Sequence, residues 1–455
     1  MTWKNVRPHI APAYLLACLL LGGSSQTIWL NASLQLFAVI ILCWALVQGS
    51  AEVPPREAKY LAMLVVAVIV LVVLQEIPLP PVVWQALPGR HMVADGLSLL
   101  SLQPDWQAMS LAPYETFSTA LALLPALAML SAIIILRAFT RAGLAFALLI
   151  GTALGIGLGI FQVGDSATTA PRFYLQPEYD AGTASGFFAN PNHMATLLLV
   201  SLPFLAALVA SGRKKAPDKR WPVIVMLGVV CAVLIAVGLL LNGSFVGLGL
   251  TIPVLLLSGL MIVRLPSWLA RVALFAAGLG AIFCVFALAT PVNRTVFHGA
   301  KATSISTRQD FFRTGIQVAR DYFPVGSGLG TFPRVYRIKE DPRTVDPSVF
   351  VNHAHNDYLE VLIETGLPGI LLVLAFLAWW LFSTVRLVRA PLVDGFAGAG
   401  AIGAATIFVH SFVDYPLRTS AIEVSLAMCF SLMALAKSRA NSEQDFRPTR
   451  HVEIH

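Results

Sequence analysis

Long apolar runs alternate with polar connections along most of the chain. Twelve runs approach the roughly 17–25 residues that an α-helix needs to cross a bilayer. They cover residues 9–24, 29–48, 59–77, 116–136, 143–163, 192–211, 222–241, 245–263, 272–290, 366–385, 396–413 and 419–437. The first run follows Lys4 and Arg7, as in a signal peptide, but it lacks a small-x-small cleavage site. The pattern therefore predicts an all-α polytopic membrane protein with about 12 transmembrane helices.

The composition supports this prediction. Apolar residues make up 57% of the chain and charged residues 12%, against about 45–50% and about 25% in ordinary soluble domains. The mean hydropathy is +0.76. The five cysteines each lie inside an apolar run, so we interpret them as small core residues and see no disulfide framework or metal-binding spacing.

The basic residues are distributed unevenly between alternate connections. With the N-terminus inside, the inner segments hold 19 of the 31 Lys and Arg residues, whereas the shorter outer segments hold only Arg90, Arg172 and Arg418. Because cytoplasmic loops carry such an excess, we expect both termini in the cytoplasm and residues 291–365 on the opposite side. This long loop holds the other nine basic residues, and a long loop can be exported despite its charge.

Two other outer segments are long. Residues 78–115 are rich in Pro, Trp and Leu, which indicates a segment lying along the membrane surface. Residues 164–191 end at Asn190-Pro191, a helix cap followed by a first-turn proline, so Asn192 and His193 are expected at the outer mouth of the sixth span. These two side chains either satisfy amides at the helix end or bind a ligand, and both interpretations stay open.

The 291–365 loop is the strongest candidate for chemistry, because the apolar segments around it are nearly free of charge. Ser306 to Gln309 fit a capping box, which predicts a helix from there to about Tyr322. Phe312, Ile316, Ala319 and Phe323 would form an apolar face that Arg308 shares, while Arg313, Gln317 and Arg320 would face solvent.

An arginine on an apolar face at a helix N-terminus favours binding of an anion, since the free amides and the helix dipole attract negative charge there. The alternative for Arg308 is a structural salt bridge, for example to Asp310. The following Pro-Val-Gly-Ser-Gly-Leu-Gly-Thr-Phe segment could let backbone approach a ligand closely. It is a weak phosphate-binding motif, because no strand-loop-helix context supports it.

His353 and His355 lie two residues apart, so they are expected to point in different directions. Asn356 is expected to cap a helix that begins at Asp357, and Gly366 and Pro368 to end it. The histidines have three interpretations: a metal site without a convincing further ligand cluster, two structural histidines, or a general base, for which a pKa of about 6.5 in free histidine is suited.

These motifs together resemble the O-antigen ligase/polymerase superfamily. The resemblance rests on Ser304 to Arg308, Pro324 to Phe332, His355 to Glu360 and Glu364 to Gly369, with Gly186 to His193 before them, and covers roughly residues 185–435. It implies a GT-C-type glycosyltransferase that uses undecaprenyl-pyrophosphate-linked saccharide donors at the periplasmic face of the bacterial inner membrane, without a metal or other cofactor. By matched position it implies His355 as the catalytic histidine and Arg308 as the donor pyrophosphate ligand.

One motif departs from the family pattern. An arginine often found at the outer end of a middle span is replaced by Phe245 in Asn242-Gly-Ser-Phe-Val-Gly247. Arg172, Arg313 or Arg418 are the candidates to replace it at the pyrophosphate. His353, Asn356, Asn192 and His193 are expected to support the site.

The apolar runs and the expected topology divide the chain into residues 1–290 with spans 1–9, a periplasmic loop at 291–365, residues 366–437 with spans 10–12, and a cytoplasmic tail at 438–455. The resemblance implies that the loop is catalytic. The expected acceptor is a glycan or lipid A-core, and no nucleic-acid partner is expected. Chemistry outside the membrane supports a lipid-linked donor, because no nucleotide sugars are present there. Cationic side chains can then stabilise the leaving pyrophosphate, and a histidine on the opposite side of the anomeric carbon would give inversion.

Two other classes of function remain open. A transporter or flippase of a polyanionic or lipid-linked substrate would carry ionisable residues in the middle of its spans, where this chain has mainly Glu423. A purely structural membrane partner would leave the Arg and His residues of the loop unexplained.

Overall fold

The computed structural model describes residues 3–25, 28–49, 53–102, 105–165, 172–176, 182–215, 221–263, 269, 272, 274, 276–282, 300–340, 351–390 and 394–436. Its helices are α1 (Trp3–Val6), η1 (Arg7–His9), α2 (Ile10–Leu21), α3 (Ile28–Gln48), α4 (Arg56–Glu76), α5 (Pro81–Ala86), α6 (His91–Leu99), α7 (Pro113–Ala122), α8 (Leu124–Ile134), α9 (Arg141–Asp165), α10 (Pro191–Lys215), α11 (Trp221–Asn242), α12 (Phe245–Ile262), α15 (Ala300–Tyr322), α16 (Phe332–Lys339), α17 (Asp357–Arg389), α18 (Gly395–His410), η2 (Pro416–Arg418) and α19 (Ser420–Ala434). Two dipeptides, β1 (Pro78–Leu79) and β2 (Gln107–Ala108), pair in antiparallel fashion.

Eight helical segments of the described chain are long and apolar enough to cross a membrane, and three further apolar helices are shorter. One of the eight is the continuous pair α7–α8. These eleven segments coincide with eleven of the twelve expected runs, and most of the run at 272–290 lies outside the described residues. The prediction of an all-α polytopic membrane protein is confirmed. The count of about 12 spans stays a prediction.

Helix α10 forms the centre of the bundle. It is buried along nearly its whole length and packs against α9, α11, α12 and α18. A helix that is apolar on all sides is stable in such a position. Small residues allow close packing beside it: a Cβ on Gly400 of α18 would lie 2.8 Å from the carbonyl oxygen of Cys429 on α19.

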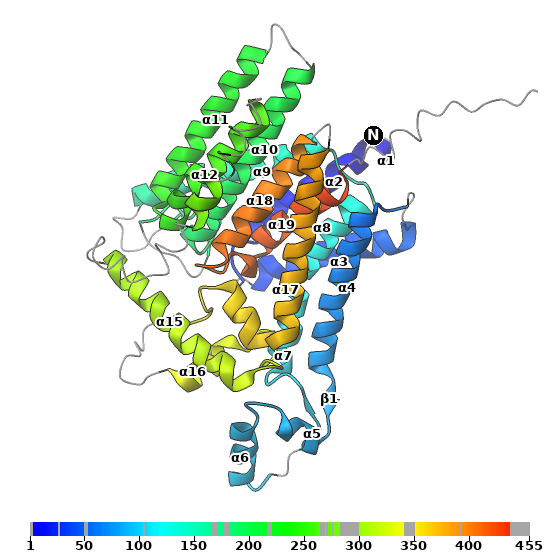
Figure 1. Cartoon of the computed structure of the whole chain (residues 1–455), viewed down its shortest axis with the longest axis vertical. Helices are drawn as coiled ribbons and strands as arrows, with labels where there is room; N and C mark the ends of the chain where they lie inside the picture. Colours follow the sequence, from blue (N-terminus) through cyan, green and yellow to red (C-terminus); the bar gives the residue numbers. More distant parts are fainter. Residues whose placement is uncertain are drawn as a thin grey trace, which may run out of the picture.

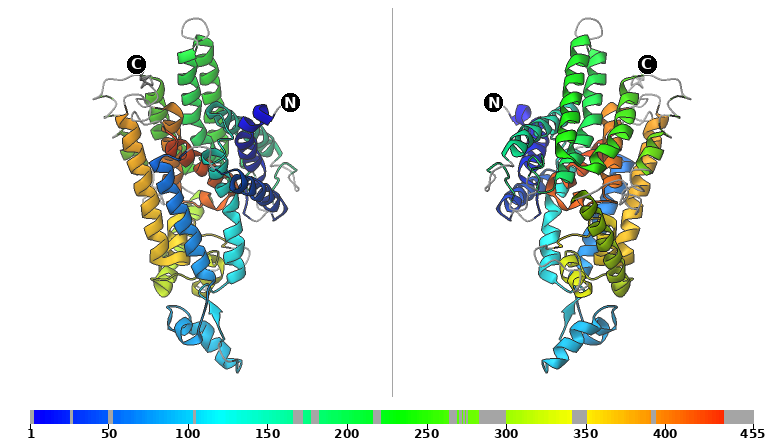
Figure 2. Two further views of the ribbon diagram at one scale, coloured as in Figure 1. Left: turned by 90° about the vertical axis from the view of Figure 1, so that its right-hand side faces the viewer. Right: turned by 90° about the vertical axis from the view of Figure 1, so that its left-hand side faces the viewer.

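The polar connections lie at two opposite ends of the bundle (Figures 1 and 2). The ends of α10 and α11 near Trp221 lie at one end, and α5, α6, α15 and α16 lie at the other. Residues 78–115 and the described part of the 291–365 loop are therefore on the same side, as the expected topology requires. The side of the membrane that each end occupies stays a prediction.

The helix that contains Arg308 begins earlier than expected. α15 starts at Ala300, so the capping box at Ser306 is wrong, although the expected end at Tyr322 is confirmed. Arg308 therefore lies within the helix and not at its N-terminus. The expected apolar face is also shifted, because Phe312 and Phe323 are exposed whereas Gly315, Val318 and Tyr322 are buried.

Helix α17 is interrupted at Gly366, which has a φ of 61° and a ψ of −146°. A side chain at this position would collide with Pro324, since a Cβ would lie 2.1 Å from its carbonyl oxygen. The break confirms that Gly366 ends the helix capped by Asn356, and a second helical segment follows directly. Residues 357–365 are thus set apart from the long helix that runs to Arg389.

Candidate active site

The side chain of Tyr415, which lies between α18 and η2, is contacted from the start of α10 and from the segment before α17. Phe311 of α15 stacks on His355 of that segment, and the start of α12 is hydrogen-bonded to the start of α10. Three histidine rings contact the ring of Tyr415: His193, His353 and His355, with centroid distances of 4.9, 4.4 and 4.9 Å. We call these four residues the Tyr415 cluster.

The backbone of His355 has the left-handed conformation, with a φ of 50°. This conformation is costly for a residue with a side chain and occurs often at functional sites. The ring stacks on Phe311 at 5.6 Å between centroids, and Nδ1 lies 3.3 Å from Oδ1 of Asp414. The side chain is 23% exposed, so His355 combines a buried carboxylate partner with access from outside.

Asn356 fixes the position of this segment. Its side-chain oxygen accepts a hydrogen bond from the Leu359 amide at 3.0 Å, which confirms the expected cap of α17. Its Nδ2 donates to the carbonyl oxygen of Phe412 at 2.8 Å, and the Asp357 amide donates to that of Ser411 at 3.0 Å. The segment with the histidines is therefore attached to the end of α18.

Asp414 is fully buried and was not predicted from the sequence. It accepts a hydrogen bond from its neighbour's amide, Tyr415 N, at 2.9 Å and from Nδ2 of Asn192. Nδ2 of Asn190 lies 3.4 Å from Oδ1. The Asn190-Pro191 start of α10 is confirmed, because Asn190 Oδ1 accepts from the Asn192 amide at 2.8 Å. The outer end of α10 thus holds the carboxylate that faces His355.

His353 has a different carboxylate partner. Its Nδ1 lies 2.9 Å from Oε1 of Glu360, and the other oxygen of Glu360 accepts from the Ala354 amide at 2.9 Å. The two histidines therefore contact carboxylates from separate elements, although both rings touch Tyr415.

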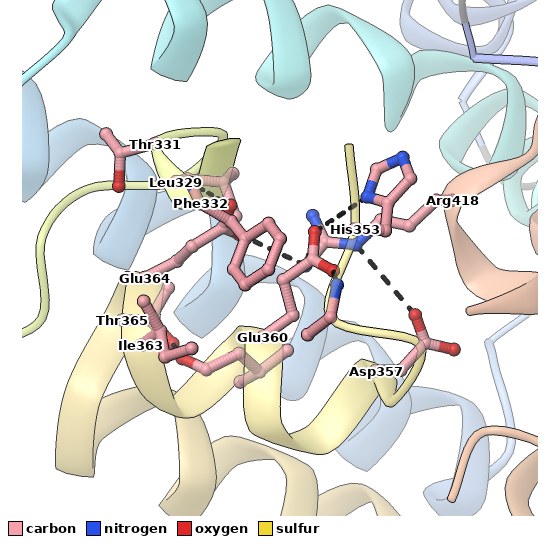
Figure 3. A network of polar contacts seen from close by, with 12 residues as sticks. Leu329, Thr331, Phe332, His353, Asp357, Glu360, Ile363, Glu364, Thr365 and Arg418 are labelled. Atoms are coloured by element: carbon pink, nitrogen blue, oxygen red, sulfur yellow. Dashed lines mark hydrogen bonds and ion pairs between the residues drawn. The ribbon is translucent and has the colours of Figure 1, made fainter. Parts of the chain in front are cut away.

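Glu360 belongs to a buried ionic network that also contains Asp357, Glu364 and Arg418 (Figure 3). Arg418 lies 3.2 Å from Glu360 and 3.1 Å from Glu364, and its Nε lies 3.8 Å from Asp357. Burial opposes the charge of Arg418, but the three carboxylates outweigh this effect and raise the pKa of its guanidinium. We call these four residues the Arg418 network. Arg418 is occupied by protein carboxylates and is not placed to replace the arginine absent at Phe245.

The glycine-rich segment that follows α15 packs against the backbone of the part of α17 that carries the network's carboxylates. Gly326, Gly328 and Gly330 all have positive φ, and a Cβ on Gly326 would lie 2.5 Å from the carbonyl oxygen of Glu364. The close approach is therefore to protein backbone. Ser327 N and Gly328 N donate to the carbonyl oxygens of Ile363 and Glu364 at 2.9 and 2.8 Å.

Two buried polar side chains hold the glycine-rich segment from the other side. Gln75 of α4 donates to the carbonyl oxygen of Glu364 at 3.0 Å and accepts from the Leu329 amide at 2.9 Å. Arg90 donates to the carbonyl oxygens of Gly326 and Met109, and burial lowers the pKa of its guanidinium to about 10. The outer segment at 78–110 is thus joined to the main loop.

The remaining predicted residues have different positions. Arg172 and Arg313 are exposed, and the side chain of Arg308 lies outside the described part of the structure. His193 is 2% exposed, and within the described chain neither of its ring nitrogens has a hydrogen-bond partner. Among the described residues no three His, Cys, Asp or Glu side chains are grouped for a metal ion.

Comparison with protein families gives a match in the middle of the chain. Residues 230–374 match the family described as O-antigen ligase, a glycosyltransferase family. No curated protein matches the chain. The match is narrower than the resemblance expected over residues 185–435, but it includes the main loop with Arg308, His353 and His355. It favours a transferase over the transporter or flippase that the sequence left open.

Proposed function

From the O-antigen ligase domain at residues 230–374, we propose that this multi-pass membrane protein is a metal-independent, inverting glycosyltransferase of the bacterial inner membrane. It transfers a saccharide from undecaprenyl pyrophosphate to a glycan or lipid A-core acceptor at the periplasmic face. It thereby acts as an O-antigen ligase or a polysaccharide polymerase. In this proposal, residues 291–365 are the catalytic loop and both termini are cytoplasmic.

The pairing of His355 with Asp414 is the observation that carries the proposal. A histidine with Nδ1 3.3 Å from a buried carboxylate and a partly exposed side chain has the arrangement of a general base. Asp414 orients the ring and stabilises the imidazolium that forms on proton transfer. His355 accepts the proton of an acceptor hydroxyl at Nε2.

In the proposed transfer one bond forms, one bond breaks and one proton is transferred. The acceptor oxygen forms a bond to the anomeric carbon while the bond from that carbon to the pyrophosphate oxygen breaks. The leaving undecaprenyl pyrophosphate takes the electron pair, and the proton goes to His355. Attack from the side opposite the leaving group inverts the anomeric configuration.

Arg308 is proposed to bind the pyrophosphate. It precedes Phe311 by three residues in α15, so the two positions share one face of the helix, and Phe311 stacks on His355. A cation at this position would stabilise the charge that gathers on the leaving group. Arg172 and Arg313 are exposed and would complete such a site only from its rim.

The test is deletion of the gene, followed by analysis of the surface polysaccharide. Loss of glycan from lipid A supports a ligase, and loss of chain length supports a polymerase. A deletion strain whose lipid A, polysaccharide chain length and glycoproteins are all unchanged would contradict the proposed transfer.

A further inference from the structure

The motif Asn242-Gly-Ser-Phe-Val-Gly247, where the family's arginine is absent, forms the joint between α11 and α12. Asn242 is buried, and its Nδ2 donates to the carbonyl oxygens of Ala184 and Pro191, each at 2.8 Å. Its Oδ1 accepts from the Ser244 amide at 3.2 Å. Asn242 thus places Ser244 beside the first turn of α10.

The hydroxyl of Ser244 has two partners with fixed roles. It is the cap of α12, and its Oγ accepts from the Gly247 amide at 3.1 Å. A backbone N–H can only donate, so the single hydroxyl proton is free for another acceptor. That acceptor is Oδ1 of Asn192, at 2.6 Å from Ser244 Oγ.

The side-chain amide of Asn192 therefore has one possible orientation. Its other end faces Oδ2 of Asp414 in a short hydrogen bond. An ionised carboxylate only accepts, so the NH2 group must point at Asp414 and the oxygen at Ser244. The reversed orientation would put the amide oxygen against the carboxylate.

We infer that Ser244 and Asn192 are positioning residues that select the proton state of His355, through a directional hydrogen-bond chain that starts at the Gly247 amide. Asn192 donates to Oδ2 of Asp414, so Asp414 is held as an acceptor whose Oδ1 faces Nδ1 of His355. Nδ1 then carries the proton, and the lone pair of Nε2 is free to act as a base. This inference rests on the proposed function of His355.

The contact between His355 and Asp414 is the longest contact in this series of hydrogen-bonded groups. At 3.3 Å it is within ion-pair distance, but the N–H direction does not meet hydrogen-bond geometry. A small rotation of the ring would close it, and catalytic hydrogen bonds are commonly long before substrate binds. Asp414 is already fixed by Asn192 and by the Tyr415 amide, so the imidazole is the group that moves.

Other titratable groups lie close to this hydrogen-bond chain. His193 of α10 and His410 of α18 interact electrostatically with one another, and His193 also interacts with Asp414, His353 and His355. His410 shares a hydrogen bond of 2.8 Å with Thr196. A pH profile alone would therefore not isolate the effect of Asn192.

The experiment uses the purified full-length protein in lipid nanodiscs. The donor is the lipid-linked saccharide extracted from the source bacterium, and the acceptor is lipid A-core from the deletion strain, or the saccharide itself if deletion shortens chains. Ser244→Ala, Ser244→Thr and Asn192→Asp are compared with wild type. Thr251→Val is the matched control, because Thr251 lies on the same helix and its hydroxyl bonds only the Gly247 carbonyl oxygen among the described residues.

We expect Ser244→Ala to lower kcat about 10-fold, and Asn192→Asp about 10²-fold or more, because loss of the correct tautomer removes most of a histidine's activity as a base. The KM of the donor should stay within about 2-fold, since both side chains are buried and hydrogen-bonded to other protein groups. Ser244→Thr should keep most of the activity, and Thr251→Val should keep the wild-type kcat.

A double-mutant comparison separates positioning from general damage. If Asn192 acts through His355, Asn192→Asp should cause little further loss when His355→Ala is already present. An equal fold-loss in both backgrounds, or a wild-type kcat in Ser244→Ala, would overturn the inference. Wild-type protein that transfers no saccharide would instead overturn the proposed function, so the two failures are distinguishable.

Discussion

Oε1 of Glu360 lies 2.9 Å from Nδ1 of His353 and is at the same time 3.2 Å from the guanidinium of Arg418. The position of His353 therefore depends on a cation supplied 65 residues later in the chain, between α18 and α19. Without Arg418, three carboxylates would lie together in the protein interior.

Arg418→Gln is expected to lower the free energy of unfolding by about 3–5 kcal/mol, because removing one partner leaves buried charges uncompensated. Thermal unfolding of the purified protein in detergent would measure the change. Arg334→Gln is the control: Arg334 is 66% exposed and pairs with Glu115, so its loss should cost about 1 kcal/mol or less. Equal unfolding temperatures for the two variants would contradict a stabilising role of the Arg418 network.

The two histidines of the main loop should respond unequally to substitution. His355→Ala should lose about 10²–10⁴ in rate with donor binding retained, because a general base is removed. His353→Ala should keep measurable turnover, since its carboxylate partner Glu360 is also held by Arg418. Initial rates across pH in lipid would test this, and an essential His353 beside a dispensable His355 would reverse the assignment.

Arg308→Ala should abolish transfer while the protein remains folded, if this arginine binds the donor pyrophosphate. Arg308→Lys should restore little activity, because a point charge does not reproduce the paired hydrogen bonds of a guanidinium. Arg320→Ala is a suitable control, since Arg320 is exposed on the same helix. Wild-type turnover in Arg308→Ala would exclude Arg308 as the pyrophosphate ligand.

Transfer should continue in the presence of EDTA. The proposed reaction places cationic side chains where many transferases use a divalent ion. Rates measured before and after chelation, with and without added zinc or magnesium, would check this. Activity that disappears on chelation and returns with zinc would instead support a metal site at His353 and His355.

The topology can be tested with reporter fusions. A reporter near Lys214 should be cytoplasmic and one near Arg343 should be exported, because the short inner loops hold the excess of basic residues. Detection of both on one side of the membrane would contradict the number of spans between them.

Local sequence signals predicted the helices and several of their ends. The apolar runs matched helices of the described chain, and Asn190-Pro191 and Asn356 cap helices as expected, because caps depend on neighbouring residues only. The start of α15 was wrong since a Ser-x-x-Gln pattern also fits the interior of a longer helix. Alanine and lysine before Ser306 favour helix and extend it.

The partners of the histidines could not be predicted in the same way. Asp414 and Arg418 lie more than 50 residues after His355 and become neighbours only when α18 returns to the outer end. The available signal was small: residues 414–418 place two charges in the short connection between the last two apolar runs. A single sequence does not indicate which distant residue meets such a charge.

Gln75 and Arg90 leave the ribosome long before some of the groups that they bind. Their partners Glu364, Leu329 and Gly326 follow 289, 254 and 236 residues later. A growing chain therefore carries the amide of Gln75, near the end of α4, and the guanidinium of Arg90, between α5 and α6, without these partners while the following spans are inserted. Closure of the outer face is thus a late event of biogenesis, and a nascent chain arrested before Gly326 would present these polar groups to membrane chaperones and quality-control proteases.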